Sequence, residues 1–111
     1  MTDFVADTVF LNGRFMPLAA AGVSPLDRGF LYGDGVYEVI PVYSRRPFRI
    51  QEHLTRLQAT LDGIKMANPL TPDGWQLVIA KLIEAAPWED QSIYLQMTRN
   101  ADDKRDHAFP T

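Results

Sequence analysis

Two basic residues near the end of the sequence, Arg105 and His107, have the type and spacing of a carboxylate-binding pair. They lie in a polar, turn-rich stretch, and two cations two residues apart can hold one carboxylate from two directions. Asp102, Asp103 and Asp106 lie beside them, so a solvated loop with balanced charges is the competing interpretation. The pair alone therefore does not establish a site.

Arg56 is the candidate for binding a phosphate. It lies in an expected helix but outside the apolar stripe, and a guanidinium presents a fork of N–H groups that matches phosphate oxygens. The competing interpretation is a surface pair with Glu52, four residues earlier on the same helix. His53 lies at the edge of the apolar stripe, and neither basic residue indicates a site by itself.

Glycines frame the approach to an expected strand, in the segments 27–30 (DRGF) and 33–38 (GDGVYE). Glycine permits a tight turn or the close approach of a ligand, although an ordinary loop before a strand would use it in the same way. Tyr37 starts the strand, and taken alone it is expected to be a core aromatic residue with its hydroxyl in water.

The lysines set a limit on the chemistry. Lys65 and Lys81 are expected on helix surfaces and Lys104 among acidic residues, so none has the apolar setting that activates a lysine for Schiff-base chemistry. The sequence has no cysteine and only two histidines, which excludes disulfides, thiol chemistry and a multi-histidine metal site.

The elements that would position these residues follow from hydrophobic periodicity and turn signals. Asn12-Gly13 between two apolar runs predicts a hairpin. Helices are expected at about 26–32, 51–66 and 71–86, the last capped by Thr71, and strands at 36–43, 48–50 and 92–98. Pro41 cannot donate to a ladder, so we expect strand 36–43 to be an edge strand or to bulge there.

Strand 36–43 should alternate between two faces. One face would carry Tyr37, Val39, Pro41 and Tyr43, and the other Val36, Glu38, Ile40 and Val42. The order of elements predicts an α+β domain of two layers, a mostly antiparallel sheet packed against two helices.

Composition narrows the function classes. A length of 111 residues fits one domain, and 46% hydrophobic and 23% charged residues are ordinary for a folded globular protein. The net charge of -3 argues against non-specific nucleic-acid binding. No run is long enough to span a bilayer, and an acid follows the first two residues where a signal peptide needs a base, so we expect a cytoplasmic protein without a membrane partner.

Taken together, the motifs resemble one family. The segments 27–30 and 33–39, Phe48, and the run 52–57 (EHLTRL) are similar in order and spacing to the N-terminal domain of the fold-type IV pyridoxal-phosphate enzymes. Within that group, the strand VYEVIPVY and the segment Arg105-x-His107-x-Phe109-Pro110 are most similar to the D-amino acid aminotransferases. The resemblance implies transfer of an amino group from a D-amino acid to a 2-oxo acid, with pyridoxal 5'-phosphate (PLP) as cofactor.

The resemblance also implies roles for individual residues. Arg56 would bind the cofactor phosphate, and Tyr37 would line the active site and help to hold the substrate carboxylate. Arg105 and His107 would bind that carboxylate from the other subunit of a homodimer. No metal is implied. The family's catalytic lysine lies in a second, larger domain, so we expect residues 1–111 to be the N-terminal domain of a longer enzyme and inactive alone.

Two departures from the family pattern leave alternatives open. Arg99-Asn100 replaces the usual Arg-Gly, with a stretch to Arg105 that is one residue longer than expected, and Pro41 replaces a longer polar side chain. The first departure shifts the carboxylate-binding pair and leaves open whether the preference for D-amino acids is strict, whereas Pro41 changes only the edge of the strand. The alternatives are a branched-chain aminotransferase, an aminodeoxychorismate lyase, or a complete chain that serves as a non-catalytic module.

Overall fold

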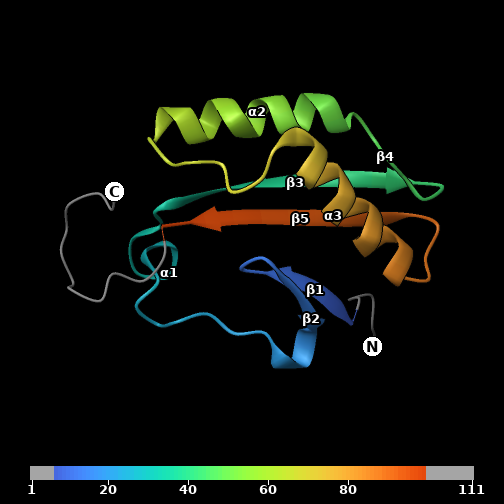
Figure 1. The fold of residues 1–111 in the computed structure, drawn as a ribbon, viewed down its shortest axis with the longest axis horizontal. Coiled ribbons are helices and arrows are strands. Elements are labelled where there is room, and N and C mark those ends of the chain that lie inside the picture. The colour runs from blue at the N-terminus through green and yellow to red at the C-terminus, as the bar shows by residue number, and fades with distance from the viewer. Residues whose placement is uncertain (1–6, 100–111) are drawn as a thin grey trace.

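The computed structural model describes residues 7–99, which fold into two layers of α+β type, as the sequence predicts (Figure 1). The elements in chain order are β1 (Thr8–Leu11), β2 (Arg14–Pro17), a 3-10 turn (Leu18–Ala20), α1 (Arg28–Tyr32), β3 (Gly35–Tyr43), β4 (Arg46–Pro47), α2 (Ile50–Gly63), α3 (Pro72–Ala85) and β5 (Gln91–Thr98). Among these residues, no helix is long and apolar enough to cross a membrane.

The predicted N-terminal hairpin is confirmed. β1 and β2 are antiparallel, and the turn between them places Asn12 at φ 51° and Gly13 at φ 85°. Positive φ at both central residues is the geometry that Asn-Gly favours. The rings of Phe10 and Phe15 lie opposite each other across the pair, with their centroids 4.8 Å apart and their planes tilted by 60°. Lys81 of α3 lies over the Phe15 ring, so the hairpin contacts α3.

The main sheet has the order β4-β3-β5, with both pairs antiparallel. β3 is thus the middle strand, where the sequence predicted an edge strand or a bulge at Pro41. Pro41 itself has no partner in β4, because β4 pairs only with Val42 and Tyr43. Up to Pro41, one side of β3 has no strand partner within residues 7–99, so the missing N–H of proline breaks no ladder there.

The predicted strand 48–50 is wrong. The returning strand is the two-residue β4, and α2 already begins at Ile50. The turn before β4 places Ser44 and Arg45 at φ 50° and 63°, a geometry that neither residue type favours. Arg45 offsets this strain by donating to the carbonyls of Ile83 and Trp88, near the C-terminal end of α3.

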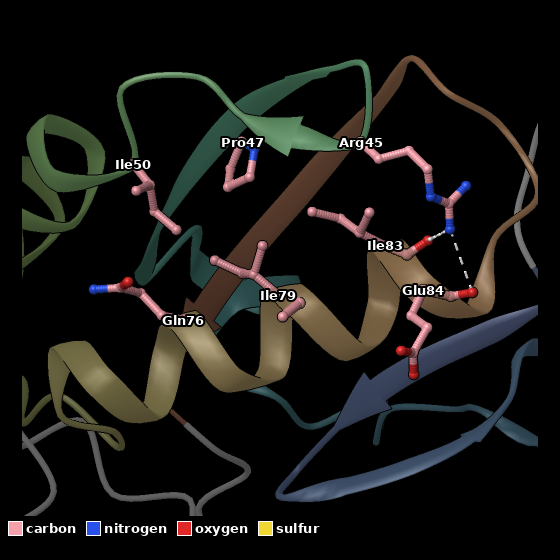
Figure 2. Close-up of a pocket in the computed structure, with 8 residues that line it drawn as sticks. Arg45, Pro47, Ile50, Gln76, Ile79, Ile83 and Glu84 are labelled. Atoms are coloured by element: carbon pink, nitrogen blue, oxygen red, sulfur yellow. Dashed lines mark hydrogen bonds between the residues drawn. The ribbon is translucent and has the colours of Figure 1, made fainter.

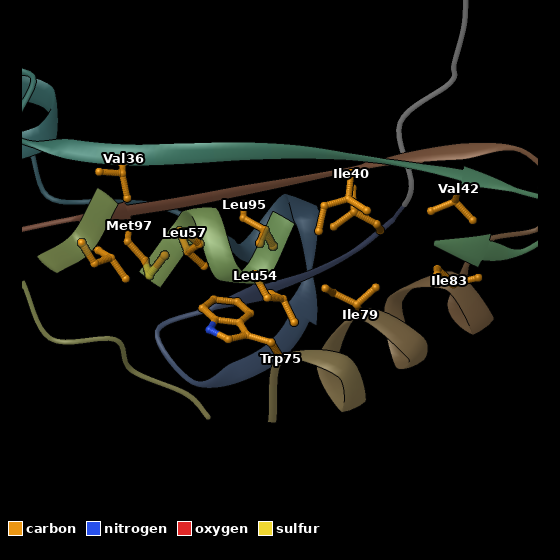
Figure 3. Packing of buried hydrophobic residues seen from close by; sticks show 12 residues of the cluster. Val36, Ile40, Val42, Leu54, Leu57, Trp75, Ile79, Ile83, Leu95 and Met97 are labelled. Carbon is orange, nitrogen blue, oxygen red and sulfur yellow. The ribbon is translucent and has the colours of Figure 1, made fainter. Parts of the chain in front are cut away.

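The two long helices form the second layer and cover one face of the main sheet (Figures 1 and 3). Thr71 caps α3 as predicted, since its hydroxyl accepts from the Gly74 N–H at 3.0 Å. The apolar stripes of both helices face the sheet. Ile64 and Leu82 are partly buried, and the fully buried members are Leu54, Leu57 and Leu61 of α2 and Trp75, Val78, Ile79 and Ile83 of α3. The most deeply buried side chains are Ile40, Leu57, Leu61, Ile79 and Val42.

The opposite face of the sheet is open in this part of the chain. β3 alternates as predicted, so Tyr37, Val39 and Tyr43 point away from the helices and are exposed. Tyr94 of β5 lies on the same face and stacks on Tyr37, with ring centroids 5.8 Å apart and planes 16° apart. The expectation that Tyr37 is a core residue is therefore wrong, because 65% of it is exposed.

Candidate functional site

An acidic side chain on the buried face of β3 forms the centre of the candidate site. Glu38 follows the alternation of the strand toward the helices, and only 6% of its side chain is exposed. A buried carboxylate needs hydrogen-bond partners. Arg56 Nε donates to Oε2 at 2.8 Å and Arg56 Nη2 to Oε1 at 2.8 Å, while His53 Nδ1 lies 2.7 Å from Oε1. These three residues are called the Glu38 cluster.

Helix α2 supplies both basic members of the cluster. His53 and Arg56 are three residues apart, so they lie on one side of the helix, next to β3. Because an ionised carboxylate only accepts, the tautomer of His53 that suits this contact has its hydrogen on Nδ1. The side chain of His53 is 15% exposed and that of Arg56 is 66% exposed, so the cluster runs from the interior to the surface.

The surface pair of Arg56 with Glu52, which was the competing interpretation, does not form. Glu52 pairs instead with Arg49 at 3.3 Å, and Arg56 reaches across to the strand. Arg56 and Glu38 each shift the pKa of the other. The hydrogen bonds from Arg56 lower the pKa of Glu38 more than burial raises it, and Glu38 in turn raises the pKa of Arg56. Both groups are therefore charged near neutral pH.

Arg56 and Tyr37 are not in contact. Glu38 holds Arg56 on the helix side of β3, whereas Tyr37 points from the opposite face. Between them runs the side of β3 that, within the described residues, has no strand partner from Gly35 to Pro41. A ligand that touched both side chains would have to lie along this edge. Arg105 and His107 fall outside the described residues.

A second cluster of charged side chains lies in the glycine-containing segment 27–38 and joins it to the end of β5. Arg28 Nε donates to Asp34 at 3.0 Å, and Arg99 Nε donates to the same carboxylate at 3.1 Å. Arg99 also donates to the carbonyls of Ile64 and Lys65, just beyond α2. The side chains of Arg28 and Arg99 are 10% and 4% exposed. Arg28, Asp34 and Arg99 are called the Asp34 cluster.

The backbones of the three residues in the Asp34 cluster are also hydrogen-bonded to one another. Arg28 N donates to Arg99 O, Arg99 N to Asp34 O, and Asp34 N to Arg28 O. The glycines allow this close approach of β5, because an added Cβ at Gly29 would overlap the Thr98 side chain and one at Gly35 would lie 2.5 Å from the Met97 carbonyl oxygen. A protein contact thus accounts for these two glycines.

A separate hollow lies between α3 and the β3–β4 turn (Figure 2). Its volume is about 360 Å³, and it is lined by Arg45, Pro47, Ile50, Gln76, Ile79, Ala80, Ile83 and Glu84. The guanidinium of Arg45 is engaged by the carbonyls of Ile83 and Glu84. Neither Tyr37 nor Arg56 lines this hollow, and its described walls are largely aliphatic.

The lysines agree with the sequence analysis as far as they are described. Lys65 and Lys81 are exposed, and Lys104 lies outside the described residues. Residues 7–99 contain no group of three histidine, aspartate or glutamate side chains that could hold a metal ion. Sequence reasoning passed over Glu38 as a site residue. The available signal was a carboxylate on an otherwise apolar strand face, which must find a partner when buried.

The sequence matches a family. The sequence model of "Amino-transferase class IV" matches residues 35–111. Curated relatives include the D-alanine aminotransferase of Staphylococcus aureus (strain N315), 35% identical over 105 residues, which are 95% of this chain and 37% of that protein. The D-alanine aminotransferase of Listeria innocua is 33% identical over 92% of this chain and 35% of its own length. The chain thus spans little more than a third of these relatives.

Solved structures share the fold. A branched-chain amino acid aminotransferase from Escherichia coli superposes with a TM-score of 0.81 at 21% identity, over 86% of this chain and 34% of that one. The branched-chain aminotransferase of the thermophilic archaeon Thermoproteus uzoniensis, solved with norvaline, superposes with a TM-score of 0.75 at 23% identity, over 93% and 37%. At these identities the likeness concerns the fold alone.

Proposed function

The chain belongs to the class IV aminotransferases, and we propose that it is the N-terminal domain of a PLP-dependent enzyme that transfers the amino group of a D-amino acid to a 2-oxo acid. The observation that carries the proposal is the exposed guanidinium of Arg56, held on a buried carboxylate. The choice of D-amino acids follows the D-alanine aminotransferases, which are 35% identical over 95% of this chain.

The donor set of Arg56 fits the phosphate of PLP. A guanidinium has five N–H donors, and Glu38 takes one from Nε and one from Nη2. The remaining donors include both of Nη1, which bonds no other residue within 7–99. A phosphate dianion accepts from such a fork at two oxygens. Bound there, PLP would supply the electron sink for chemistry at the substrate's α-carbon.

The remaining roles concern the substrate. Tyr37, with its exposed ring fixed against Tyr94, would border the substrate and help to hold its carboxylate. Arg105 and His107 would hold the same carboxylate from the second subunit of a homodimer. Neither lysine in the described part is buried. We therefore assign the lysine that bonds the cofactor to a second domain of the same protein, and we place the enzyme in the cytoplasm.

Mass and activity of the protein made from its native gene test this proposal. We expect an intact mass well above 12.6 kDa. With PLP bound, D-alanine and 2-oxoglutarate should yield pyruvate and glutamate, and the visible spectrum of the cofactor should change on adding D-alanine. A product of 12.6 kDa, or a spectrum that responds to no amino acid, would overturn the proposal and favour a non-catalytic module.

A double variant distinguishes the alternatives within the family. Replacing both Arg105 and His107 by alanine should remove most turnover of D-alanine while leaving PLP bound, because the role proposed for them concerns only the substrate. Likeness to branched-chain aminotransferases in fold makes L-valine the comparison substrate. If L-valine reacts better than D-alanine, the enzyme is of the branched-chain type. If D-alanine turnover survives the double change, the assignment of this loop is wrong.

A further inference from the structure

Glu38 and Arg56 meet along one particular edge of the guanidinium. Nε and Nη2 each donate to a different oxygen of Glu38 at 2.8 Å, so the carboxylate occupies the side edge of the group. The two donors of Nη1 lie along the other edge, and Nη2 also lies 3.4 Å from His53 Nδ1. Arg56 is 66% exposed. One guanidinium can therefore bind the carboxylate along one edge and a second anion along the next.

We propose that Glu38 is a positioning residue for the phosphate site: it holds Arg56 by its side edge, so that the free edge keeps one direction toward the cofactor phosphate. The inference rests on the proposed role of Arg56. An arginine side chain has several rotatable bonds, and fixing them in advance reduces the entropy lost on binding. Glu38 can act in this way because it is itself immobilised on β3, the middle strand of the main sheet.

His53 completes the arrangement from the inside. Its Nδ1 lies 2.7 Å from the Oε1 that also accepts from Arg56, and its side chain is 15% exposed. This bond fixes the rotation of the carboxylate group. With the two bonds from Arg56 alone, the carboxylate could rotate together with the arginine. His53 thus orients Glu38, and Glu38 orients Arg56.

The same helix contains a natural comparison. Arg49 pairs with Glu52 through a single contact at 3.3 Å, and both side chains are about as exposed as Arg56, at 64% and 65%. The Arg49 guanidinium lies over the ring of the adjacent Phe48, 5.2 Å from its centroid, and Glu52 lies on α2 rather than on a strand. This pair has the charges of the Arg56–Glu38 pair without the rigid carboxylate, and it provides the matched control.

A simpler role for Glu38 is to neutralise the charge of Arg56. The two roles predict opposite effects of Glu38→Gln on phosphate binding. If Glu38 only neutralised Arg56, removing its charge would strengthen phosphate binding, since a negative group close to the site would be gone. If Glu38 positions Arg56, Glu38→Gln should weaken phosphate binding, because an amide offers one acceptor oxygen where the carboxylate offers two.

The test compares PLP with pyridoxal, which lacks the phosphate. Dissociation constants of both are measured spectroscopically on the apo form of the protein from the native gene, for wild type, Glu38→Gln and Glu52→Gln. The ratio of the two constants isolates the phosphate contribution, and a general loss of structure would move both constants together. We expect Glu38→Gln to reduce the preference for PLP about tenfold, the scale of one charge-assisted hydrogen bond, and Glu52→Gln to leave it unchanged.

Each outcome decides a separate point. A preference that is unchanged or increased in Glu38→Gln would overturn the positioning role while leaving the proposed function intact. Absence of any preference for PLP in the wild type would instead refute the phosphate role of Arg56. Should Glu38→Gln fail to fold, His53→Phe keeps the Arg56–Glu38 pair and removes only the orienting bond. It should lower the preference severalfold, and an unchanged value there would equally overturn the inference.

Discussion

The Asp34 cluster and the Glu38 cluster contain the same kinds of side chain but differ in how exposed their cationic groups are. Each has one carboxylate between two basic side chains. In the Asp34 cluster both arginines are buried, and Arg99 directs its other donors to backbone carbonyls at the end of α2. In the Glu38 cluster Arg56 is two-thirds exposed. The first arrangement fixes the fold, and the second leaves a cation available to a ligand.

The largest effect is expected from breaking the buried cluster. Asp34→Asn removes the carboxylate that two buried guanidinium groups share, and removing one partner of a buried ion pair costs about 3 kcal/mol or more. Urea unfolding should show this as a lower midpoint at similar slope. Asp62→Asn, at an exposed carboxylate that accepts from Gln58, is the control and should change little. A loss below about 1 kcal/mol at Asp34 would contradict the structural role assigned to this cluster.

The close approach of β5 gives the next effect. A Cβ at Gly35 would lie 2.5 Å from the Met97 carbonyl oxygen, so Gly35→Ala forces the two strands apart and should cost about 1–3 kcal/mol. Gly63→Ala provides the contrast. Nothing lies within 4 Å of an added Cβ there, and alanine favours the helix, so stability should be equal or slightly higher in the same urea experiment. Equal behaviour of the two variants would argue against the packing described at Gly35.

The Glu38 cluster should show itself in the pH dependence of stability. Arg56 lowers the pKa of Glu38 in the folded state below the unfolded value. The contribution of the pair is therefore complete above the unfolded pKa and is lost as the pH falls through the lowered folded pKa. The stability difference between wild type and Glu38→Gln, measured by urea unfolding, should shrink as the pH falls from neutral into this acidic range. A difference that stays constant would contradict the ion pair.

The smallest effect on stability is expected at the exposed end of the same cluster. Arg56→Met removes a guanidinium that lies largely in water, and His53 still bonds the carboxylate. Glu38 then keeps one of its two partners, so the urea midpoint should move less than in Asp34→Asn, where one change affects two buried guanidinium groups. A shift as large as that of Asp34→Asn would mean that Arg56 serves the fold rather than a ligand.

Local signals predicted the elements that short stretches of sequence determine. Asn12-Gly13 encodes its own turn, and Thr71 encodes the start of α3. The turn at Ser44 and Arg45 has the same positive φ values without a local signal, because it is stabilised by contacts with α3, about forty residues further along the chain. The two-residue β4 follows from that turn and could not be read from the segment 48–50.

The same distinction applies to the site. Arg56 was correctly placed on a helix and outside the apolar stripe, yet its partner could not be chosen from the sequence. Helical spacing favours Glu52, whereas the folded chain brings Glu38 from eighteen residues away. The alternation of β3 already placed Glu38 among buried apolar residues. A carboxylate in that position needs a cation, and this requirement was the signal that sequence reasoning left unused.

The central claim is that Arg56, and no other arginine of α2 or its N-cap, binds the cofactor phosphate. The most direct measurement compares Arg56→Met with Arg49→Met, since both arginines are about two-thirds exposed and each pairs with a glutamate. The ratio of the dissociation constants of pyridoxal and PLP is measured on the protein from the native gene. The account predicts that Arg56→Met abolishes most of the preference for PLP and that Arg49→Met retains it. Equal ratios in the two variants would contradict it.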